Sequence, residues 1–131
     1  MYAHIQLGVR NRDAMTAFYD KVLAELGLVR VTDLEAVGPA GVIWRRPDRR
    51  WPQFVIDAPF DGRPATTANG SQVSFLAPSR AAVEAAWTVA LSLSATDLGR
   101  PNVRSRYAPD FYAAYCLDPE GHKLCFVHTE G

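Results

Sequence analysis

An internal repeat constrains the fold of this chain more strongly than any other feature of its sequence. Residues 4–23 and 72–91 match each other at an offset of 68 positions, first in an alternating apolar stretch and then in a helix-like stretch. The offset places Ile5 on Val73, for example. Such a repeat predicts two copies of one structural unit. Because a doubled unit forms a pseudo-symmetric groove, we expect polar residues at equivalent places in the two halves to meet there.

The charge balance argues against a polyanionic partner. The chain has 131 residues, with 14 Lys plus Arg and 14 Asp plus Glu, so its formal net charge is zero. Without a global basic field we expect neither nucleic acid nor a membrane among its partners, and no stretch has the apolar length of a bilayer span. Two cysteines do not make a disulfide framework in a chain of this size. This usage favours a reducing compartment, and we predict a cytoplasmic protein.

The first half of the chain predicts a strand, a helix and three further strands. Apolar and polar side chains alternate in residues 4–9, which is typical of a half-buried strand. Asn11 can cap the following helix, and Gly27 lies where a C-terminal cap belongs. The apolar stripe of this helix consists of Met15, Phe18, Tyr19, Val22, Leu23 and Leu26. Strand-like runs follow at about residues 28–37, 41–46 and 53–57.

The second half repeats this order. Residues 71–76 predict a strand, and Ser79 is a good helix cap. Residues 95–110 predict a short strand and a loop. The end of the chain predicts a hairpin around residues 118–121, because proline at the second turn position and glycine at the fourth favour such a turn.

Each half therefore predicts a β-α-β-β-β unit, and the fold class is α+β. We expect one domain over residues 1–131, built from two modules of about residues 1–58 and 70–131. The stretch between them, residues 59–69, is rich in Pro, Gly, Thr and Asp and is interpreted as the linker.

Two such units, with Phe18 and Tyr19 in the first helix and the sequence Asp-Pro-Glu-Gly-His at residues 118–122, resemble the vicinal oxygen chelate superfamily. This superfamily contains glyoxalase I, bleomycin-resistance proteins and extradiol dioxygenases. Residues 77–83 and 112–115 look like its glyoxalase-like branch. The resemblance covers nearly the whole chain. It implies a cupped, barrel-like mixed sheet with the helices outside, in which each unit supplies half of the cup.

The resemblance also implies site residues, since metal ligands in this superfamily come from the first and last strands of the units. By position these are His4, its equivalent Gln72, and Cys125 at the last-strand position where the family usually has Glu. At the same offset, the place in the first unit that matches Cys125 is Asp57. Strand parity supports His4, Gln72 and Cys125, because each lies opposite its apolar neighbours. If the apolar faces pack under the helices, all three point into the cup.

Two interpretations of this site stay open. A divalent metal, with zinc, nickel or iron as candidates, would be held by His4, Gln72 and Cys125, with Asp57 as a further candidate, and would polarise a substrate's vicinal oxygens. Alternatively the site has lost its metal, because cysteine supplies no fixed carboxylate and a thiol at its usual pKa is mostly protonated at neutral pH. The ligand preferences of these metals favour the second interpretation. The usual Glu can also serve as the proton-transfer base, so its replacement bears on catalysis as well.

Aromatic and arginine side chains are candidates for ligand contacts, because in the related folds the strands and the loop before the last hairpin wall the cup. The candidate ligand-binding residues are Trp44, Phe54, Arg104, Tyr107 and Tyr112. Large aromatics are often buried, and about half of those in this chain are expected to belong to the core. Arg104 and Arg106 could hold a carboxylate of a ligand. His122 is expected to be a solvated turn residue.

Two classes of function follow from the resemblance. The first is a glyoxalase-like lyase or isomerase that acts on a small oxygenated substrate, with His4, Gln72 and Cys125 as its catalytic residues. The second is a metal-free protein of the bleomycin-resistance type, which binds or sequesters a small-molecule ligand. Family members commonly dimerise, and exposed sheet edges would favour a homodimer here.

Overall fold

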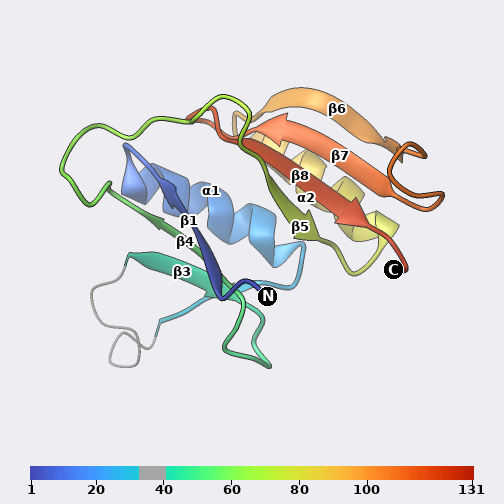
Figure 1. Ribbon diagram of the computed structural model, residues 1–131, viewed down its shortest axis with the longest axis horizontal. Coiled ribbons are helices and arrows are strands. Elements are labelled where there is room, and N and C mark those ends of the chain that lie inside the picture. Colours follow the sequence, from blue (N-terminus) through green and yellow to red (C-terminus); the bar gives the residue numbers. More distant parts are fainter. Residues whose placement is uncertain (33–40) are drawn as a thin grey trace. The chain divides into compact units, whose positions relative to one another are not determined.

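The computed structural model describes residues 1–32 and 41–131, which form two compact units, residues 1–66 and 67–131. The boundary between the units falls inside the predicted linker, residues 59–69. Within the described ranges each unit contains one helix and one four-stranded mixed sheet, which confirms the α+β fold class (Figure 1). Neither helix has the length and apolar composition needed to cross a membrane.

The first unit forms the sheet β1-β4-β3-β2, in which β1 is parallel to β4 and the other pairs are antiparallel. Its elements are β1 (His4–Gly8), α1 (Arg12–Ala24), β2 (Val29–Arg30), β3 (Val42–Arg45) and β4 (Gln53–Asp57). The strands predicted at 41–46 and 53–57 are thus present. The strand predicted at 28–37 is described only as far as residue 32, and its remainder lies outside the described residues.

Both ends of α1 lie where the sequence places them. The Asn11 side chain accepts a hydrogen bond from the Ala14 amide at 3.0 Å, which satisfies one of the free N–H groups of the first turn. Gly27 has a φ of 78°, and the amide of the next residue, Leu28, bonds back to the Leu23 carbonyl at 3.0 Å. This is the left-handed termination that glycine favours. The helix therefore begins and ends through local sequence signals.

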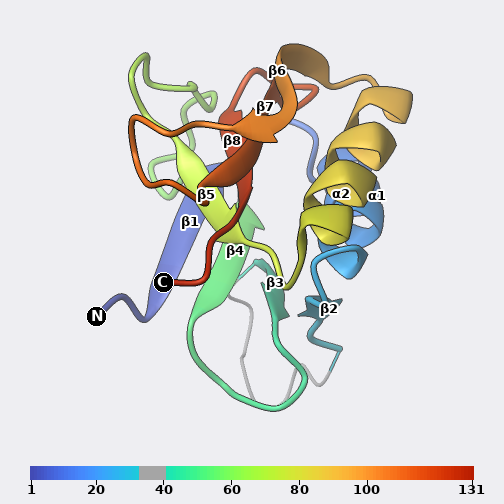
Figure 2. The ribbon, with the colours of Figure 1, turned by 90° about the vertical axis from the view of Figure 1, so that its right-hand side faces the viewer.

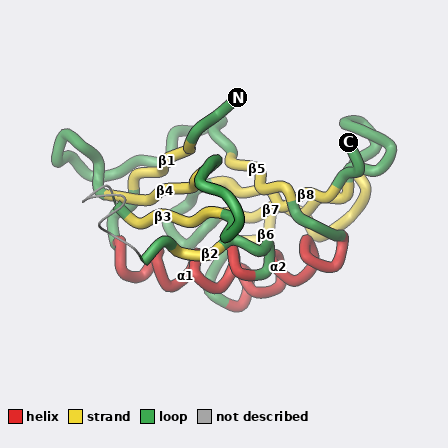
Figure 3. The backbone as a smooth tube through the Cα atoms, turned by 90° about the horizontal axis from the view of Figure 1, so that it is seen from below, coloured by secondary structure: helices red, strands yellow, loops and turns green. Residues whose placement is uncertain are grey.

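The core of the first unit is an aromatic cluster between α1 and the sheet. The Tyr19 ring lies 4.9 Å from the Phe54 ring and 5.8 Å from the Trp44 ring, measured between centroids. Trp44 is 1% exposed, and its indole N–H donates to Asp20 of α1 at 3.0 Å. We expected Trp44 and Phe54 to line a ligand site. They are buried core residues instead, because both rings pack against Tyr19 of α1. Figure 3 shows this helix on one side of the strands.

The second unit repeats the plan, with the sheet order β5-β8-β7-β6. Its elements are β5 (Val73–Leu76), α2 (Arg80–Ser92), β6 (Thr96–Val103), β7 (Tyr112–Leu117) and β8 (Lys123–His128). In Figure 1 the strands run from β5 at one edge to β6 at the other. The strand β6 is longer than the predicted short strand and continues through Pro101. An edge strand tolerates proline, because a missing N–H on its outer side breaks no ladder bond.

The helices confirm the repeat at the offset of 68. Ser79 accepts a hydrogen bond from the Ala82 amide at 3.0 Å, as Asn11 does from Ala14 in the first unit. The buried side chains of α1 have counterparts that are also buried in α2, namely Met15 with Val83, Phe18 with Ala86 and Val22 with Ala90. The same positions in the two copies therefore face the two cores.

Alternation along β7 and β8 gives the sheet of the second unit two distinct faces. Figure 2 shows α2 on one side of this sheet. Leu124 and Phe126, both fully buried, share a sheet face with Tyr112, whose hydroxyl donates to Glu84 of α2, so they lie on the face that α2 covers. Cys125 and Lys123 lie on the opposite face, as does Tyr115, the strand partner of Cys125. The parity predicted for Cys125 matches this arrangement. The face away from α2 is the one available for a ligand.

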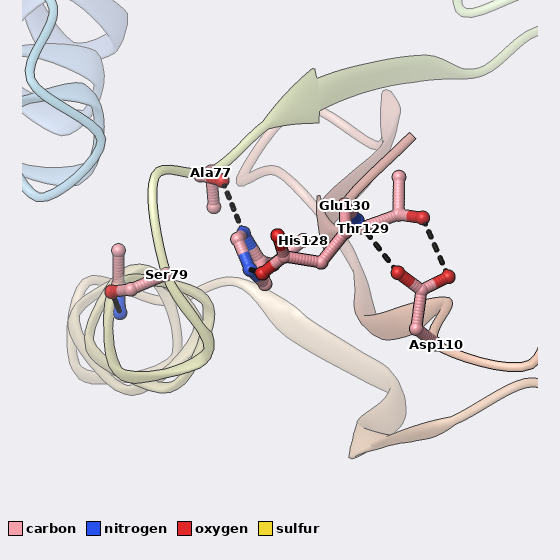
Figure 4. A network of polar contacts seen from close by, with 7 residues as sticks. Ala77, Ser79, Asp110, His128, Thr129 and Glu130 are labelled. Atoms are coloured by element: carbon pink, nitrogen blue, oxygen red, sulfur yellow. Dashed lines mark hydrogen bonds and ion pairs between the residues drawn. The ribbon is translucent and has the colours of Figure 1, made fainter.

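A polar clasp joins the end of the chain to the loop before β7. Asp110 accepts hydrogen bonds from the Thr129 hydroxyl at 2.8 Å and from the Glu130 amide at 2.6 Å (Figure 4). His128 bonds the Ala77 carbonyl at 3.0 Å. The Glu130 amide and then the Thr129 hydroxyl hold the pKa of Asp110 below its usual value. A lowered pKa means that this contribution to stability is present above about pH 4 and is lost as pH falls further.

Asp110→Asn is expected to loosen the chain end, because the new side chain presents an NH₂ group to one of two donors. We expect the Glu130 amide to exchange with solvent at least several times faster, measured by hydrogen exchange at neutral pH. The control is Asp61→Asn, which alters a comparable contact to the Arg63 amide in an exposed turn. Unchanged exchange at Glu130 in the Asp110 variant would contradict the clasp.

Candidate ligand-binding cleft

A cleft of about 600 Å³ lies in the second unit, on the sheet face away from α2. Strands β6, β7 and β8 and the loop after β6 contribute to it. Its polar lining consists of Gln72, Arg104, Arg106 and Lys123. The remaining lining consists of Leu98, Gly99, Tyr107, Phe111 and Tyr115. The cleft therefore combines basic groups with aromatic walls, and none of the described residues that line it is acidic.

Arg104 is held in place by the backbone around it. Its amide donates to the Phe111 carbonyl at 2.7 Å, and its Nη2 donates to the Arg100 carbonyl at 2.6 Å. The guanidinium carbon lies 5.6 Å from the centroid of the Tyr115 ring. Its Nε is buried and has no hydrogen-bond partner among the described residues. One edge of the guanidinium is thus fixed, while a buried donor is left unsatisfied.

Gly99 makes room for this arginine. A Cβ atom at Gly99 would lie 3.1 Å from Arg104 Nη2 and 3.4 Å from the Tyr115 ring. The first distance is shorter than an ordinary van der Waals contact, so any side chain here would displace the guanidinium. A glycine in the middle of β6 weakens the strand, since it has no side chain to pack. The close approach of Arg104 explains why this position of the strand is a glycine rather than a residue with a side chain.

Tyr115 lies against both Arg104 and Lys123. The Lys123 Nζ is 5.6 Å from the ring centroid, the same distance as the Arg104 guanidinium. Burial, followed by the neighbouring Cys125, raises the pKa of the Tyr115 hydroxyl to about 12. The ring therefore stays neutral at physiological pH and offers a face that favours cations. Arg104 and Lys123 thus both place their positive charge near the Tyr115 ring.

Of the predicted central residues, Gln72 borders the cleft and Cys125 lies under its wall. The Gln72 amide donates to the Ser74 hydroxyl at 2.9 Å. Cys125 is 0% exposed and packs with Ala113 and Val127 beneath Tyr115. Burial raises the pKa of the Cys125 thiol, although hydrogen bonds from Ser74 and Tyr115 oppose this. In the metal-free protein the thiol is protonated at neutral pH and has no exposed surface, so it presents no accessible thiolate to an ion.

The second cysteine does not pair with the first. Cys116 lies opposite Leu124 in the β7–β8 ladder, whereas Cys125 lies opposite Tyr115, so the two thiols occupy opposite faces of the sheet. Both are free and buried. This register rules out a cross-strand disulfide between them, because their side chains point apart.

His4 and Asp57 belong to the first unit. His4 is exposed on β1. Asp57 forms an ion pair with Arg12 at 3.1 Å and accepts from the Ala58 amide at 2.8 Å. The strand registers also change which residue of the first unit corresponds to Cys125, a place that the offset of 68 assigned to Asp57. Gln6 lies opposite Val55, and its repeat counterpart Ser74 lies opposite Cys125, so Cys125 corresponds to Val55 rather than to Asp57.

Arg104 and Tyr107, both candidates from the sequence, line the cleft. Tyr112 does not, because its hydroxyl donates to Glu84 of α2 at 2.6 Å on the other face of the sheet. The expectation of a solvated His122 was wrong, since this side chain is 6% exposed. Sequence reasoning missed Lys123. The sequence offered one signal for it: Lys123 lies two residues before Cys125 on the last strand, and residues two apart on a strand lie on the same face of the sheet.

The residues of the second unit do not fit a divalent metal. Within the described residues, no three His, Cys, Asp or Glu side chains gather where they could hold an ion. Gln72 offers only a neutral amide oxygen, and the Cys125 thiol is buried and protonated. Three cationic side chains at the same cleft would repel a divalent cation. The donor set is thus neutral and weak, and the charges beside it have the wrong sign.

Comparison with known proteins identifies relatives among solved structures. No family model and no curated protein matches the chain. A crystal structure of a glyoxalase/bleomycin resistance protein from Albidiferax ferrireducens T118 is similar with 30% sequence identity and a TM-score of 0.82, over 98% of each chain.

Two more distant structures share the fold. One is a glyoxalase/bleomycin resistance protein/dioxygenase family enzyme from Burkholderia phytofirmans PsJN, with 19% identity, a TM-score of 0.70 and coverage of 96% of each chain. The other is a lactoylglutathione lyase from Agrobacterium tumefaciens, with 21% identity and a TM-score of 0.62, over 98% of this chain and 92% of that one. At these identities the likeness shows the fold alone.

Proposed function

This chain belongs to the glyoxalase/bleomycin resistance protein family of the vicinal oxygen chelate superfamily, and we propose that it binds a small organic molecule in the cleft of its second unit without a metal ion. The cleft volume of about 600 Å³ lies within the range of small-molecule sites, which is about 300–1,000 Å³. The observation that carries the proposal is the lining itself, in which every charged side chain is cationic.

This lining favours the binding class over the metal-dependent enzyme. A divalent ion beside Gln72 would face Arg104, Arg106 and Lys123 with no carboxylate among the lining residues to offset them. Such an ion needs oxygen or thiolate donors that carry negative charge, or several imidazoles. The energetic balance therefore opposes a metal on this face of the sheet.

Proton-transfer chemistry is also disfavoured at the last-strand position. A general base must be deprotonated at working pH and within reach of the substrate. Burial raises the pKa of the Cys125 thiol, and this side chain is fully buried beneath Tyr115. We therefore favour binding or sequestration over the lyase or isomerase alternative. A homodimer and a cytoplasmic location stay predictions from the sequence.

Metal addition should leave the stability of the protein unchanged. A metal that prefers the folded state, at 100 times its dissociation constant, would add about 2.7 kcal/mol to the free energy of unfolding. When zinc, nickel or ferrous iron is added to chelator-treated protein, we expect the free energy of unfolding to increase by less than about a tenth of this amount, measured by thermal unfolding. Stabilisation by several degrees that is lost in His4→Ala would contradict the proposal.

The positive test uses three flat probes of one ring system, namely 2-naphthol, 2-naphthamide and 2-naphthoate. We expect at least one to bind chelator-treated protein, measured by ligand-detected NMR, and Phe111→Ala to weaken every probe that binds. Failure of all three to bind, or binding that appears only after metal is added, would refute metal-free recognition in this cleft.

A further inference from the structure

We propose that the molecule bound by the cleft is an organic anion, a carboxylate attached to a flat aromatic or apolar body, and that Arg104 and Lys123 bind its carboxylate. This inference rests on the proposed function, since it names the class of ligand that the same cleft takes. Three independent features of the second unit lead to it: uncompensated charge, an unsatisfied buried donor and the aromatic wall.

The charge of the cleft is uncompensated. Neither Arg104 nor Lys123 forms an ion pair within the described part of the chain. Arginines elsewhere do form them, namely Arg12, Arg30, Arg46, Arg49 and Arg63. Both cleft cations lie 5.6 Å from the centroid of the Tyr115 ring. Like charges without a counterion raise the electrostatic potential of the cleft that they line, and an anion bound in the cleft lowers it.

Arg104 contributes hydrogen-bond donors in fixed directions as well as charge. Its Nη2 is occupied by the Arg100 carbonyl, while its buried Nε has no partner among the described residues. A buried donor without an acceptor is unfavourable, and a small shift of the guanidinium that lets a ligand oxygen accept from Nε removes this cost. A carboxylate suits this position, because its oxygens accept charge-assisted hydrogen bonds from a planar guanidinium.

The remaining wall of the cleft selects an apolar body. The Tyr107 and Phe111 rings lie 5.1 Å apart between centroids and are tilted by 55°. Tyr107 and Leu98 are both exposed, which places large apolar surfaces at the cleft rather than in the core. Aromatic rings pack favourably against flat partners in offset or edge-on geometry. A bare inorganic anion would leave this wall without a contact.

The first experiment compares 2-naphthoate with 2-naphthamide, which has the same ring and shape but no charge. Chelator-treated full-length protein is titrated with each at low salt, with acetate and inorganic phosphate as ring-free anions. We expect 2-naphthoate to bind at least 10-fold more tightly than 2-naphthamide and than either ring-free anion. Equal affinity for the two naphthyl probes would overturn the anion assignment while leaving metal-free binding in place.

Variants then test which side chains bind the carboxylate. Arg104→Gln and Lys123→Gln are each expected to reduce the preference for 2-naphthoate by 5-fold or more, with the affinity for 2-naphthamide changed less than 3-fold. Arg80→Gln is the matched control, because it removes one positive charge from α2, where Arg80 lies over the Tyr112 ring on the other sheet face. An equal loss in the control would show that the preference is a general charge effect and would refute the assigned residues.

Gly99→Ala provides a second test that removes no charge. Its Cβ would lie 3.1 Å from Arg104 Nη2, the far end of a flexible side chain, so the guanidinium can move away while the fold persists. We expect the 2-naphthoate preference to fall at least 3-fold with the far-ultraviolet circular dichroism spectrum unchanged. A folded Gly99→Ala protein that keeps the full preference would overturn the role of Arg104.

Discussion

Trp44→Ala is expected to lower the free energy of unfolding by about 3–5 kcal/mol, the usual loss for deleting a large buried aromatic side chain. Trp44 is 1% exposed and lies within 6.0 Å of the Phe54 ring, between centroids. The substitution removes these contacts and leaves a cavity that a small unit cannot refill. It also removes one donor to Asp20, which keeps its ion pair with Arg30 at 3.0 Å. The loss should therefore come from packing more than from an unpaired carboxylate.

The measurement is urea denaturation followed by circular dichroism, with Trp51→Ala as the matched control. Trp51 is 46% exposed, and its removal should cost less than about 1 kcal/mol, since exposed sites tolerate substitution. A Trp44→Ala protein as stable as the control, but with weakened binding of the naphthyl probes, would mean that this tryptophan lines the ligand site after all.

Compared with Cys125→Gln, Cys125→Glu should destabilise the protein strongly at neutral pH and only weakly in acid. The substitution installs the carboxylate that the family usually has at the last-strand position. Here that position is buried among Ala113 and Val127, so the charged form is disfavoured and the pKa of the new glutamate rises. Each unit by which the pKa rises corresponds to about 1.4 kcal/mol. Because the usual pKa of glutamate is about 4.3, burying this carboxyl group can lower the free energy of unfolding by at most about 3–4 kcal/mol at pH 7.

The sign of this pH dependence follows from proton binding. A glutamate with a raised pKa in the folded state keeps its proton where the unfolded chain has lost it, so stability falls as pH rises above about 4.3. Cys125→Gln is the matched control, because it has the same shape and does not titrate. The difference between the two variants, measured by urea denaturation at pH 4.5 and 7.5, isolates the charge. A glutamate variant that matches the control at pH 7.5 and is stabilised by zinc would support a metal site instead.

The fold was predictable because its signals are local or periodic. Asn11 and Ser79 mark the helix starts through side-chain caps, and Gly27 marks a helix end through its positive φ. The repeat at an offset of 68 assigns the same order of elements to both halves. The strand β6 was harder to predict, because it runs through Pro101 and changes register against β7. Neither feature follows the simple alternation that identifies a strand.

The site was predictable only in part, because residue type does not reveal which face of a sheet a side chain occupies. Aromatic residues pack cores and line clefts alike. Strand register decides between the two, and it turns Trp44 and Tyr112 toward the helices but Tyr115 toward the cleft. The role of Gly99 depends on the approach of Arg104 from a loop five positions later, a tertiary contact without a local signal.

The most direct test of metal-free anion recognition is an NMR titration of ¹⁵N-labelled, chelator-treated protein with 2-naphthoate. The largest changes in amide chemical shift are expected at Gly99, Arg104, Tyr115 and Lys123, saturating together and unchanged when zinc is added. Chemical-shift changes that appear only with zinc present, or that centre on His4 and the rest of β1, would contradict it.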